Sequence, residues 1–596
     1  MRSVLLSLLV VVVGSVSGAC TAGPGEAPTS SVAPSTTTTI PVTSAPTATT
    51  SIAPSTTTTI PVTSAPTTTT LPPSPSFENL GLAASWVVQL DDGVAFGVNE
   101  SEQGFDLSGD GDTDDVVVHV VSDATVVNTG LQARWGVVPI AGGGFVVQVS
   151  ERDLGADLNG DGDAVDTVPS TWNADDGAAS LGMAAWVTPG PDGSLWLESP
   201  GPDAQTLRVL RSDGRLIDTG WIATSVRPRD DGTALIGVSE REQGRDLNGD
   251  GTLTEHVLVL WAERHPAEVI GPAYVYDSTT DGGIWLAWDE RDEQGRVQSW
   301  HLGFWHRDTD FVDLPIATVN HTAMPNGGLI FGVSETTDYW SYSYECNQGG
   351  QDLNGDGDCA DFILHRWSPA SGLVSLGLIQ QGWCPECEWG YVTSGDVAWA
   401  SQREWEMGQD LDGDGEVTDA SVLHVVEGDA VHNLGVRVSW DTRRWAALDG
   451  GAVVLVEEAT RDLNDDADVA DGVFHFVPNT GAAINIGLGG GSAQALSTGE
   501  VVLLAEEAGN GRDFNGDGYI SDDTYVIHIW SPQRGLTNTG LTNGRYMDEE
   551  GPSRPYLVGT LPDRELVALV PEWQQGDGDL NGDGDTNDVV VHVVSM

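Results

Sequence analysis

Eight short acidic loops are the part of this sequence whose residue types and spacing could do chemistry. They begin at Asp106, Asp157, Asp246, Asp352, Asp410, Asp462, Asp513 and Asp579, and their common form is D-L-N-G-D-G-D-x-x-D. Oxygen-bearing side chains at positions 1, 3, 5, 7 and 10 surround a tight turn. This set suits calcium, a hard cation that takes roughly six to eight oxygen ligands. The predicted cofactor is therefore Ca2+, at about eight ions per chain.

The predicted metal ligands are one set of five positions repeated in each loop. They are Asp106, Ser108, Asp110, Asp112, Asp115; Asp157, Asn159, Asp161, Asp163, Asp166; Asp246, Asn248, Asp250, Thr252, Glu255; Asp352, Asn354, Asp356, Asp358, Asp361; Asp410, Asp412, Asp414, Glu416, Asp419; Asp462, Asn464, Asp466, Asp468, Asp471; Asp513, Asn515, Asp517, Tyr519, Asp522; and Asp579, Asn581, Asp583, Asp585, Asp588. Position 7 is Thr252 or Tyr519 in two loops, which predicts a backbone carbonyl ligand there. Position 10 is acidic in all eight loops and is predicted to supply the closing carboxylate.

Two further features qualify this pattern. A Glu stands six residues before five of the loops and is a candidate ligand or a support for the ligands: Glu100, Glu151, Glu240, Glu404 and Glu507. Ala467 replaces the Gly at position 6, which makes the loop at Asp462 the weakest of the set. Asp/Asn/Gly-rich turns also form without metal, as they would on a salt-adapted surface. Eight copies of crowded carboxylates favour a bound cation, because like charges repel one another without one.

The overall charge excludes one class of partner. The formal net charge is -64, and all 25 basic residues are Arg. Such a surface repels phosphate backbones, so nucleic acid is not an expected partner. The predicted partner is a protein or carbohydrate ligand, with the chain itself a monomer.

The N-terminal residues are typical of an export signal. Arg2 precedes an apolar run from Val4 to Val13, and small residues then lead to Cys20. Ser17-Gly18-Ala19-Cys20 resembles the lipobox of bacterial lipoproteins, which implies lipidation at Cys20 and a membrane contact through that anchor alone. The alternative is an ordinary secretory signal. Residues 1–20 are thus predicted to be a signal peptide, and residues 21–76, rich in Thr, Ser and Pro, an unfolded linker. The expected location is extracytoplasmic, lipid-anchored at the membrane or at the cell surface.

Four further cysteines fit an exported protein. Cys346, Cys359, Cys384 and Cys387 are predicted to form two disulfides, with three pairings open. The Cys384-Pro385-Glu386-Cys387 spacing leaves a redox motif or half a zinc site as alternatives.

From Phe77 onward, the chain repeats at about fifty residues. In 440–488, short β-branched runs at 445–448, 452–456, 473–477 and 483–488 predict four strands separated by turns, with the acidic loop between the second and third. Tandem four-stranded units predict an all-β fold, a β-propeller of about ten units over 77–596. Two units, around Leu195–Leu210 and Trp285–Trp305, lack the loop.

The two ends of the repeat region complement each other. Residues 77–82 form a fourth strand with nothing before it, and Val589 to Val594 form a third strand with no fourth after it. Their pairing would complete one unit and close the propeller. Two smaller propellers or a β-solenoid remain the alternatives.

The loops and the strands that follow them resemble the calcium loops of FG-GAP and VCBS-type propellers, the family that includes integrin α heads. An EF-hand is excluded, because position 12 lies in a strand in place of a helix and lacks the required acid. The resemblance implies structural calcium and a surface binding or adhesion module. An extracellular hydrolase on a propeller scaffold is the alternative, although no catalytic constellation is found. Histidines recur in the third strand (His119, His365, His475 and His592, with His424 and His528 nearby) and are predicted to make structural hydrogen bonds. A zinc or catalytic role is the alternative.

Overall fold

The structure is a computed structural model that describes residues 77–595 apart from short gaps, the longest at 336–351 and 380–389. Antiparallel sheets make up almost all of it, and apart from one two-stranded hairpin they fall into units of four strands. The predicted signal peptide, linker and Cys20 lie outside the described residues. Among the described residues, no helix has the length and apolar character needed to cross a membrane.

Ten units follow one another along the chain, and the strands of the first five are as follows. Unit 1 has the second half of β1 (Phe77–Gln89), β2 (Val94–Asn99), β3 (Val116–Ser122) and β4 (Thr125–Gln132); unit 2 has β5 (Val138–Ile140), β6 (Gly144–Ser150), β7 (Thr167–Asn173) and β8 (Gly177–Ser180); unit 3 has β9 (Trp186–Pro189), β10 (Leu195–Glu198), β11 (Arg208–Leu210) and β12 (Leu216–Asp218); unit 4 has β13 (Ala223–Pro228), β14 (Ala234–Ser239), β15 (His256–Ala262) and β16 (His265–Gly271); unit 5 has β17 (Tyr274–Ser278), β18 (Ile284–Arg291), β19 (Val297–His306) and β20 (Thr309–Leu314).

The strands of the other five units complete the set. Unit 6 has β21 (Thr318–Ala323), β22 (Leu329–Ser334), β23 (Phe362–Ser368) and β24 (Gly372–Ile379); unit 7 has β25 (Tyr391–Ser394), β26 (Val397–Arg403), β27 (Ser421–Glu427) and β28 (Ala430–Arg437); unit 8 has β29 (Ala446–Leu448), β30 (Gly451–Glu457), β31 (Gly472–Pro478) and the first half of β32 (Ile484–Ala495); unit 9 has the rest of β32, β33 (Val501–Glu506), β34 (Tyr525–Ser531) and β35 (Gly535–Thr542); unit 10 has β38 (Gly559–Thr560), β39 (Glu565–Pro571), β40 (Val589–Ser595) and the first half of β1. A small hairpin, β36 (Met547–Asp548) and β37 (Gly551–Pro552), lies between units 9 and 10.

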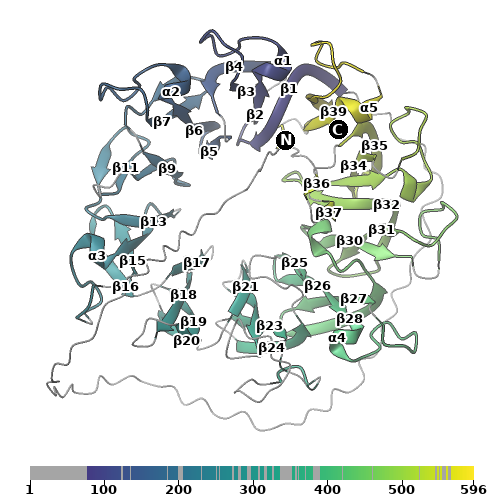
Figure 1. Cartoon of the computed structure of the whole chain (residues 1–596). Helices are drawn as coiled ribbons and strands as arrows, with labels where there is room; N and C mark the ends of the chain where they lie inside the picture. Colours follow the sequence, from purple (N-terminus) through teal and green to yellow (C-terminus); the bar gives the residue numbers. More distant parts are fainter. Residues whose placement is uncertain are drawn as a thin grey trace, which may run out of the picture. The chain divides into compact units, whose positions relative to one another are not determined.

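The predicted pairing of the two ends is confirmed. Phe77 pairs with Val594 and Asn79 with His592, so β1 supplies the fourth strand of unit 10 before it continues into unit 1. Figure 1 shows β1 and β39 close together where the described chain begins and ends, and β40 lies between them in the sheet. The four strands predicted within 440–488 are also confirmed, and the fourth, β32, runs on into unit 9.

The core lies between neighbouring sheets. Side chains alternate along each strand, so both faces of a central strand are buried. In β33, Val501 and Leu503 pack toward unit 8, whereas Val502 and Leu504 pack toward unit 10. This arrangement explains why the strands read as nearly continuous apolar runs.

The apolar clusters decide between one propeller and two. Among the described residues, ten clusters each join two neighbouring units. Trp285 and Phe331 join units 5 and 6, and Phe96 and Leu569 join units 1 and 10. Two separate five-unit propellers would need no joint between units 5 and 6. The ten units therefore form one closed circuit, a single ten-unit β-propeller.

The recurring histidines have a structural place in this fold. In all six, Nδ1 lies 2.8–3.3 Å from the backbone carbonyl oxygen two residues earlier, and each imidazole is buried. Burial lowers the pKa of these rings, to about 4 for His424, His475 and His528. The predicted structural hydrogen bond is confirmed for His119, His365, His424, His475, His528 and His592.

Candidate metal centre

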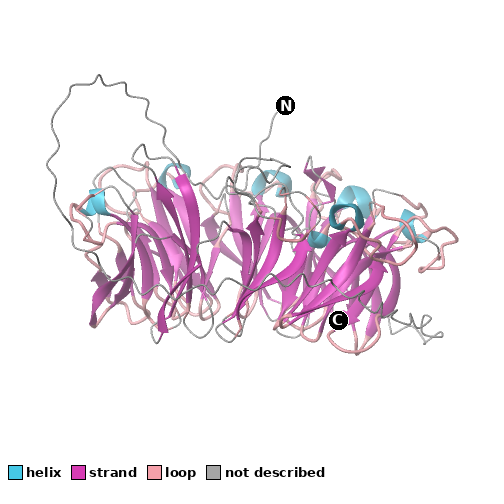
Figure 2. Cartoon of the chain, turned by 90° about the horizontal axis from the view of Figure 1, so that it is seen from below, coloured by secondary structure: helices cyan, strands magenta, loops and turns pink. Residues whose placement is uncertain are grey.

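Each acidic loop connects the second and third strands of its unit, as predicted. Position 12 lies inside the third strand in seven loops, and in the eighth it is Thr524, directly before β34. In six of these units, a short helical turn lies between the second strand and the acidic loop: α1 (Glu100–Gln103), α2 (Glu151–Leu154), α3 (Glu240–Gln243), α4 (Glu404–Met407), η3 (Ala508–Asn510) and α5 (Glu572–Gln575). Because every unit has the same strand order, these turns lie at the same ends of the strands, as Figure 2 shows. The sequences that connect the second and third strands of units 3 and 5 do not contain the acidic motif.

A buried Glu lies directly after the second strand in all eight loop-bearing units. The eight residues are Glu100, Glu151, Glu240, Glu335, Glu404, Glu458, Glu507 and Glu572, and each is at most 2% exposed. Their Oε1 atoms accept hydrogen bonds from the backbone at the start of the loop. For Glu100, the donors are the N–H groups of Leu107, at 2.5 Å, and Ser108, at 2.7 Å. Each Glu therefore fixes the first turn of its loop.

Sequence reasoning found five of these eight residues and missed Glu335, Glu458 and Glu572. The missed residues precede their loops by 17, 4 and 7 residues in place of six. The position that they share is the end of the second strand, where the Glu N–H donates to a carbonyl at the end of the loop, such as that of Asp361 or Asp471. Counting from the strand end would have found all eight.

Four of these glutamates have an oxygen with no partner. The Oε2 atoms of Glu100, Glu240, Glu458 and Glu507 are buried and make no hydrogen bond. A buried carboxylate oxygen without a hydrogen-bond partner costs more folding free energy than a buried neutral group without one. These oxygens are therefore suited to a ligand.

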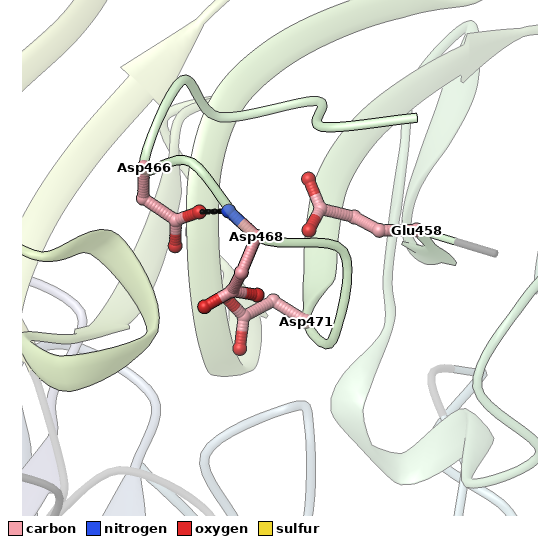
Figure 3. Close-up of side chains that lie close together, drawn as sticks. All are labelled: Glu458, Asp466, Asp468 and Asp471. Atoms are coloured by element: carbon pink, nitrogen blue, oxygen red, sulfur yellow. Dashed lines mark hydrogen bonds between the residues drawn. The ribbon is translucent and has the colours of Figure 1, made fainter. Parts of the chain in front are cut away.

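Two of these four residues, Glu100 and Glu458, lie in clusters of loop carboxylates. Figure 3 shows the fullest cluster, where Glu458, Asp466, Asp468 and Asp471 each bring an oxygen within 4.8 Å of the others. Positions 7 and 10 join the Glu in three further loops: Glu100 with Asp112 and Asp115, Glu151 with Asp163 and Asp166, and Glu572 with Asp585 and Asp588. In these four loops, the side chains at positions 7 and 10 both lie in the cluster, whereas the backbone carbonyl was the predicted ligand at position 7. The closing role of position 10 stays a prediction.

The position-1 carboxylate holds each loop closed. In the first loop, Asp106 accepts hydrogen bonds from the N–H groups of Gly109, at 2.6 Å, and Gly111, at 3.1 Å. The same pair of bonds, from positions 4 and 6, recurs in all eight loops. The turn is therefore organised by the loop itself.

Position 2 anchors the loop to the sheet. Its side chain packs against the core, as for Leu107 and Leu158. Its carbonyl accepts a hydrogen bond from an Asn in the fourth strand in five units, at 2.7–3.0 Å; these Asn are Asn79, Asn128, Asn433, Asn485 and Asn538. The loop thus has fixed points on the second and fourth strands of its unit.

The loops also contact neighbouring units. The side-chain amide of Asn581 donates to the Glu102 carbonyl of unit 1 at 3.1 Å, and Asn464 and Asn515 donate to the next unit in the same way. In the opposite direction, Gln103 of α1 accepts from the Ala83 N–H, at 2.8 Å, in the last strand of unit 10. These hydrogen bonds therefore connect the loop regions to the sheets of neighbouring units.

Crowding of the carboxylates perturbs their titration. Burial, together with the nearby charges of Asp110 and Glu100, raises the pKa of Asp115 to about 7. Burial and Asp466 raise the pKa of Asp471 to about 7 in the same way. The cluster therefore holds more negative charge than its own surroundings neutralise, which favours a hard cation with oxygen ligands.

Several predicted site residues lie outside the described part of the chain. These are Asp250, Glu255, Asp356, Asp358, Asp419 and Asp522, and the cysteines Cys346, Cys384 and Cys387. Cys359 is buried and disulfide-bonded. The pairing of the cysteines stays a prediction, as does lipidation of Cys20.

Comparison with known proteins gives limited similarity. No protein-family model matches the chain, and no curated protein matches it. Similar solved structures include the β-propeller domain of the Trilobed protease from Pyrococcus furiosus, with 8% identity, 60% of this chain and 96% of that chain covered, and a TM-score of 0.28. A eukaryotic initiation factor matches with 8% identity, 69% and 89% coverage and a TM-score of 0.38. YCF48 bound to D1 peptide matches with 8% identity, 57% and 94% coverage and a TM-score of 0.25. The propeller assignment rests on the sheets and clusters of this chain.

Proposed function

We propose that this protein is an exported calcium-binding β-propeller, in which calcium stiffens the loops of a surface binding or adhesion module. The observation that carries the calcium part is the buried, unpartnered Glu oxygen beside the acidic cluster, as at Glu100 with Asp112 and Asp115. Carboxylate and carbonyl oxygens on a flexible loop are the ligands that calcium prefers. The loop's place between two strands of one unit also supports the resemblance to FG-GAP and VCBS-type propellers.

A structural role for calcium follows from where the loops are anchored. Their fixed points include the second strand, the fourth strand and, for several loops, a neighbouring unit. Extracellular calcium modules bind at roughly 10⁻⁴–10⁻³ M, so such sites would stay filled outside a cell. Calcium would then neutralise the crowded carboxylates and hold neighbouring sheets in register.

Thermal unfolding and ion counting test the calcium part. We expect millimolar calcium to raise the melting temperature strongly relative to excess chelator, with several ions bound per chain by native mass spectrometry. Glu100→Gln keeps an oxygen that accepts from Leu107 and Ser108 but removes the charge, so it should lose one ion. Glu198→Gln, in a unit without an acidic loop, is the matched control and should lose none. An unchanged melt with no bound metal would refute the calcium proposal.

The binding role needs a separate test. It rests on the predicted export signal, the predicted linker and the extended set of anchored loops. We expect cells that lack the protein to lose adhesion to at least one surface, glycan or protein. Supplying the protein again should restore adhesion only when calcium is present. Unchanged adhesion across a broad ligand panel would count against the proposal.

A further inference from the structure

One acidic loop already has a cation of its own. In unit 7, Arg437 ends β28, and its guanidinium reaches back into the loop at 410–419. Nε donates to Asp412 and Nη2 donates to Asp414, which are positions 3 and 5 of the loop. The Asp412 side chain is only 8% exposed, whereas Asp414 is 41% exposed, so the ion pair is buried on the Asp412 side alone. The fork geometry of Arg suits two carboxylates at once.

The corresponding position in other units is uncharged. Arg437 lies opposite Val422 of the third strand, the register position that Gln132 occupies opposite Val117 in unit 1. The other described residues at this position are Ala83, Ile379, Gly489 and Thr542. A positive side chain at this register is therefore particular to unit 7 among the described pairs.

The loop in unit 7 differs in one further way. Its position 3 is Asp412, whereas the other seven loops have Asn or Ser there. Its Glu404 does not set it apart: Oε2 accepts from the backbone N–H and the hydroxyl of Thr418, both at 3.1 Å, and the Oε2 atoms of Glu151, Glu335 and Glu572 also accept a backbone hydrogen bond.

From these observations, and resting on the proposed calcium function, we infer that Arg437 replaces calcium in unit 7. Its guanidinium neutralises Asp412 and Asp414 and ties the loop to the fourth strand. A divalent ion at the same carboxylates would face a fixed positive charge. The chain would therefore bind calcium through seven loops, and unit 7 would keep its loop ordered without metal.

Ion counting on single variants of the full-length chain tests this inference. We expect seven calcium ions in the native chain and eight in Arg437→Gln, which restores the residue type found in unit 1. Arg403→Gln is the matched control: it removes the same charge from the same unit, where Arg403 pairs with Glu406 outside the loop, and should leave seven ions. Gln132→Arg, the reciprocal change, should leave six.

A second measurement does not depend on bound calcium. In excess chelator, Arg437→Gln should unfold at a lower temperature than Arg403→Gln, because calcium is absent from the other loops of both variants and only Arg437→Gln also removes the cation of the unit 7 loop. Eight ions in the native chain, unchanged by Arg437→Gln, would overturn the inference and leave the proposed function intact. No ions in any variant would overturn both.

Discussion

At the scale of single residues, the loop at 462–471 shows what the glycines of the other loops do. Asp465 and Ala467 have φ of 63° and 83°, and they are the only described residues other than glycine with positive φ. The other loops have Gly at both positions. An L-residue with a left-handed backbone costs roughly 1–2 kcal/mol. The sequence correctly marks Ala467 as the departure, and the structure shows that the loop keeps its form at a cost in strain.

Ala467→Gly should therefore stabilise the protein. Gly relieves the backbone strain, but its greater freedom in the unfolded chain costs roughly 0.5–1 kcal/mol. The expected net gain in the free energy of unfolding is about 0.5–1 kcal/mol. Gly111→Ala in the first loop should destabilise by a similar amount; the added Cβ meets nothing within 4 Å, so only the backbone is tested. The measurement is the denaturation midpoint in saturating calcium. Shifts of the same sign in both variants would refute this account.

The buried histidines should make stability fall in acid. The folded pKa of His424, His475 and His528 is about 4, below the ordinary 6.5, so the folded chain excludes protons that the unfolded chain binds. This contribution is fully present above pH 6.5 and is lost as the pH falls toward 4. Between pH 7.5 and 5, each histidine should cost on the order of 2 kcal/mol.

His528→Gln isolates one of these contributions. We expect the variant to lose less stability than the native chain between pH 7.5 and 5, measured by denaturation midpoints at both pH values. NMR titration should show the native imidazole still neutral at pH 5. Parallel pH profiles for the two proteins would contradict the assignment.

At the scale of strands and loops, the sequence predicts the strands and the acidic loops, but it does not predict contacts between residues that are distant in the chain. Alternating apolar runs and Gly-rich turns predict the four strands of a unit, and the spacing of acids predicts eight loops between second and third strands. Spacing to the loop does not show that Glu335 and Glu458 hold equivalent places, because their distances to the loops differ; only their shared position after the second strand does. Nor does spacing show that Arg437 faces Asp412, since the two lie 25 residues apart.

Contacts between units also explain why position 3 is mostly Asn. A carboxylate would offer oxygen to a cation, but only an amide can also donate to the next unit, as Asn581 does to Glu102. Asn581→Asp would place a carboxylate against that carbonyl and should weaken the interface between units 10 and 1 by about 1–3 kcal/mol.

The control for this change is Asn159→Asp. Asn159 donates within its own loop, to Asp161 and Asp166, and reaches no neighbouring unit through a described bond. We expect melting in excess calcium to fall further for Asn581→Asp than for Asn159→Asp. An equal fall would show that the contact across the interface adds nothing.

At the scale of the whole molecule, closure depends on seven residues. Residues 77–83 supply the fourth strand of unit 10, and Leu80 and Leu82 pack against the cluster that joins units 10 and 1. The complementary ends are visible in the sequence, whereas the number of propellers is not: only the apolar joint between units 5 and 6 excludes two smaller ones.

A chain that begins at Ala84 should therefore unfold at a melting temperature lower by roughly 5 °C or more than one that begins at Phe77, because it exposes an unpaired strand edge. Both chains lack the predicted linker, so only closure is compared. Equal melting temperatures would show that the terminal pairing contributes no stability.

The pairing of β1 with β40 also sets an order of events during biosynthesis. Residues 77–83 leave the ribosome some five hundred residues before their partners at 589–595 are made, so units 1 to 9 exist for a time with an open edge. Two molecules at that stage have the same unpaired edge at residues 77–83 and lack the same partner strand at 589–595. Once residues 589–595 are made, those of one molecule can pair with residues 77–83 of the other through the same contacts. The product is a strand-exchanged dimer. Dilute chains close on themselves because their own strand has the higher effective concentration, and crowded chains do not have that advantage.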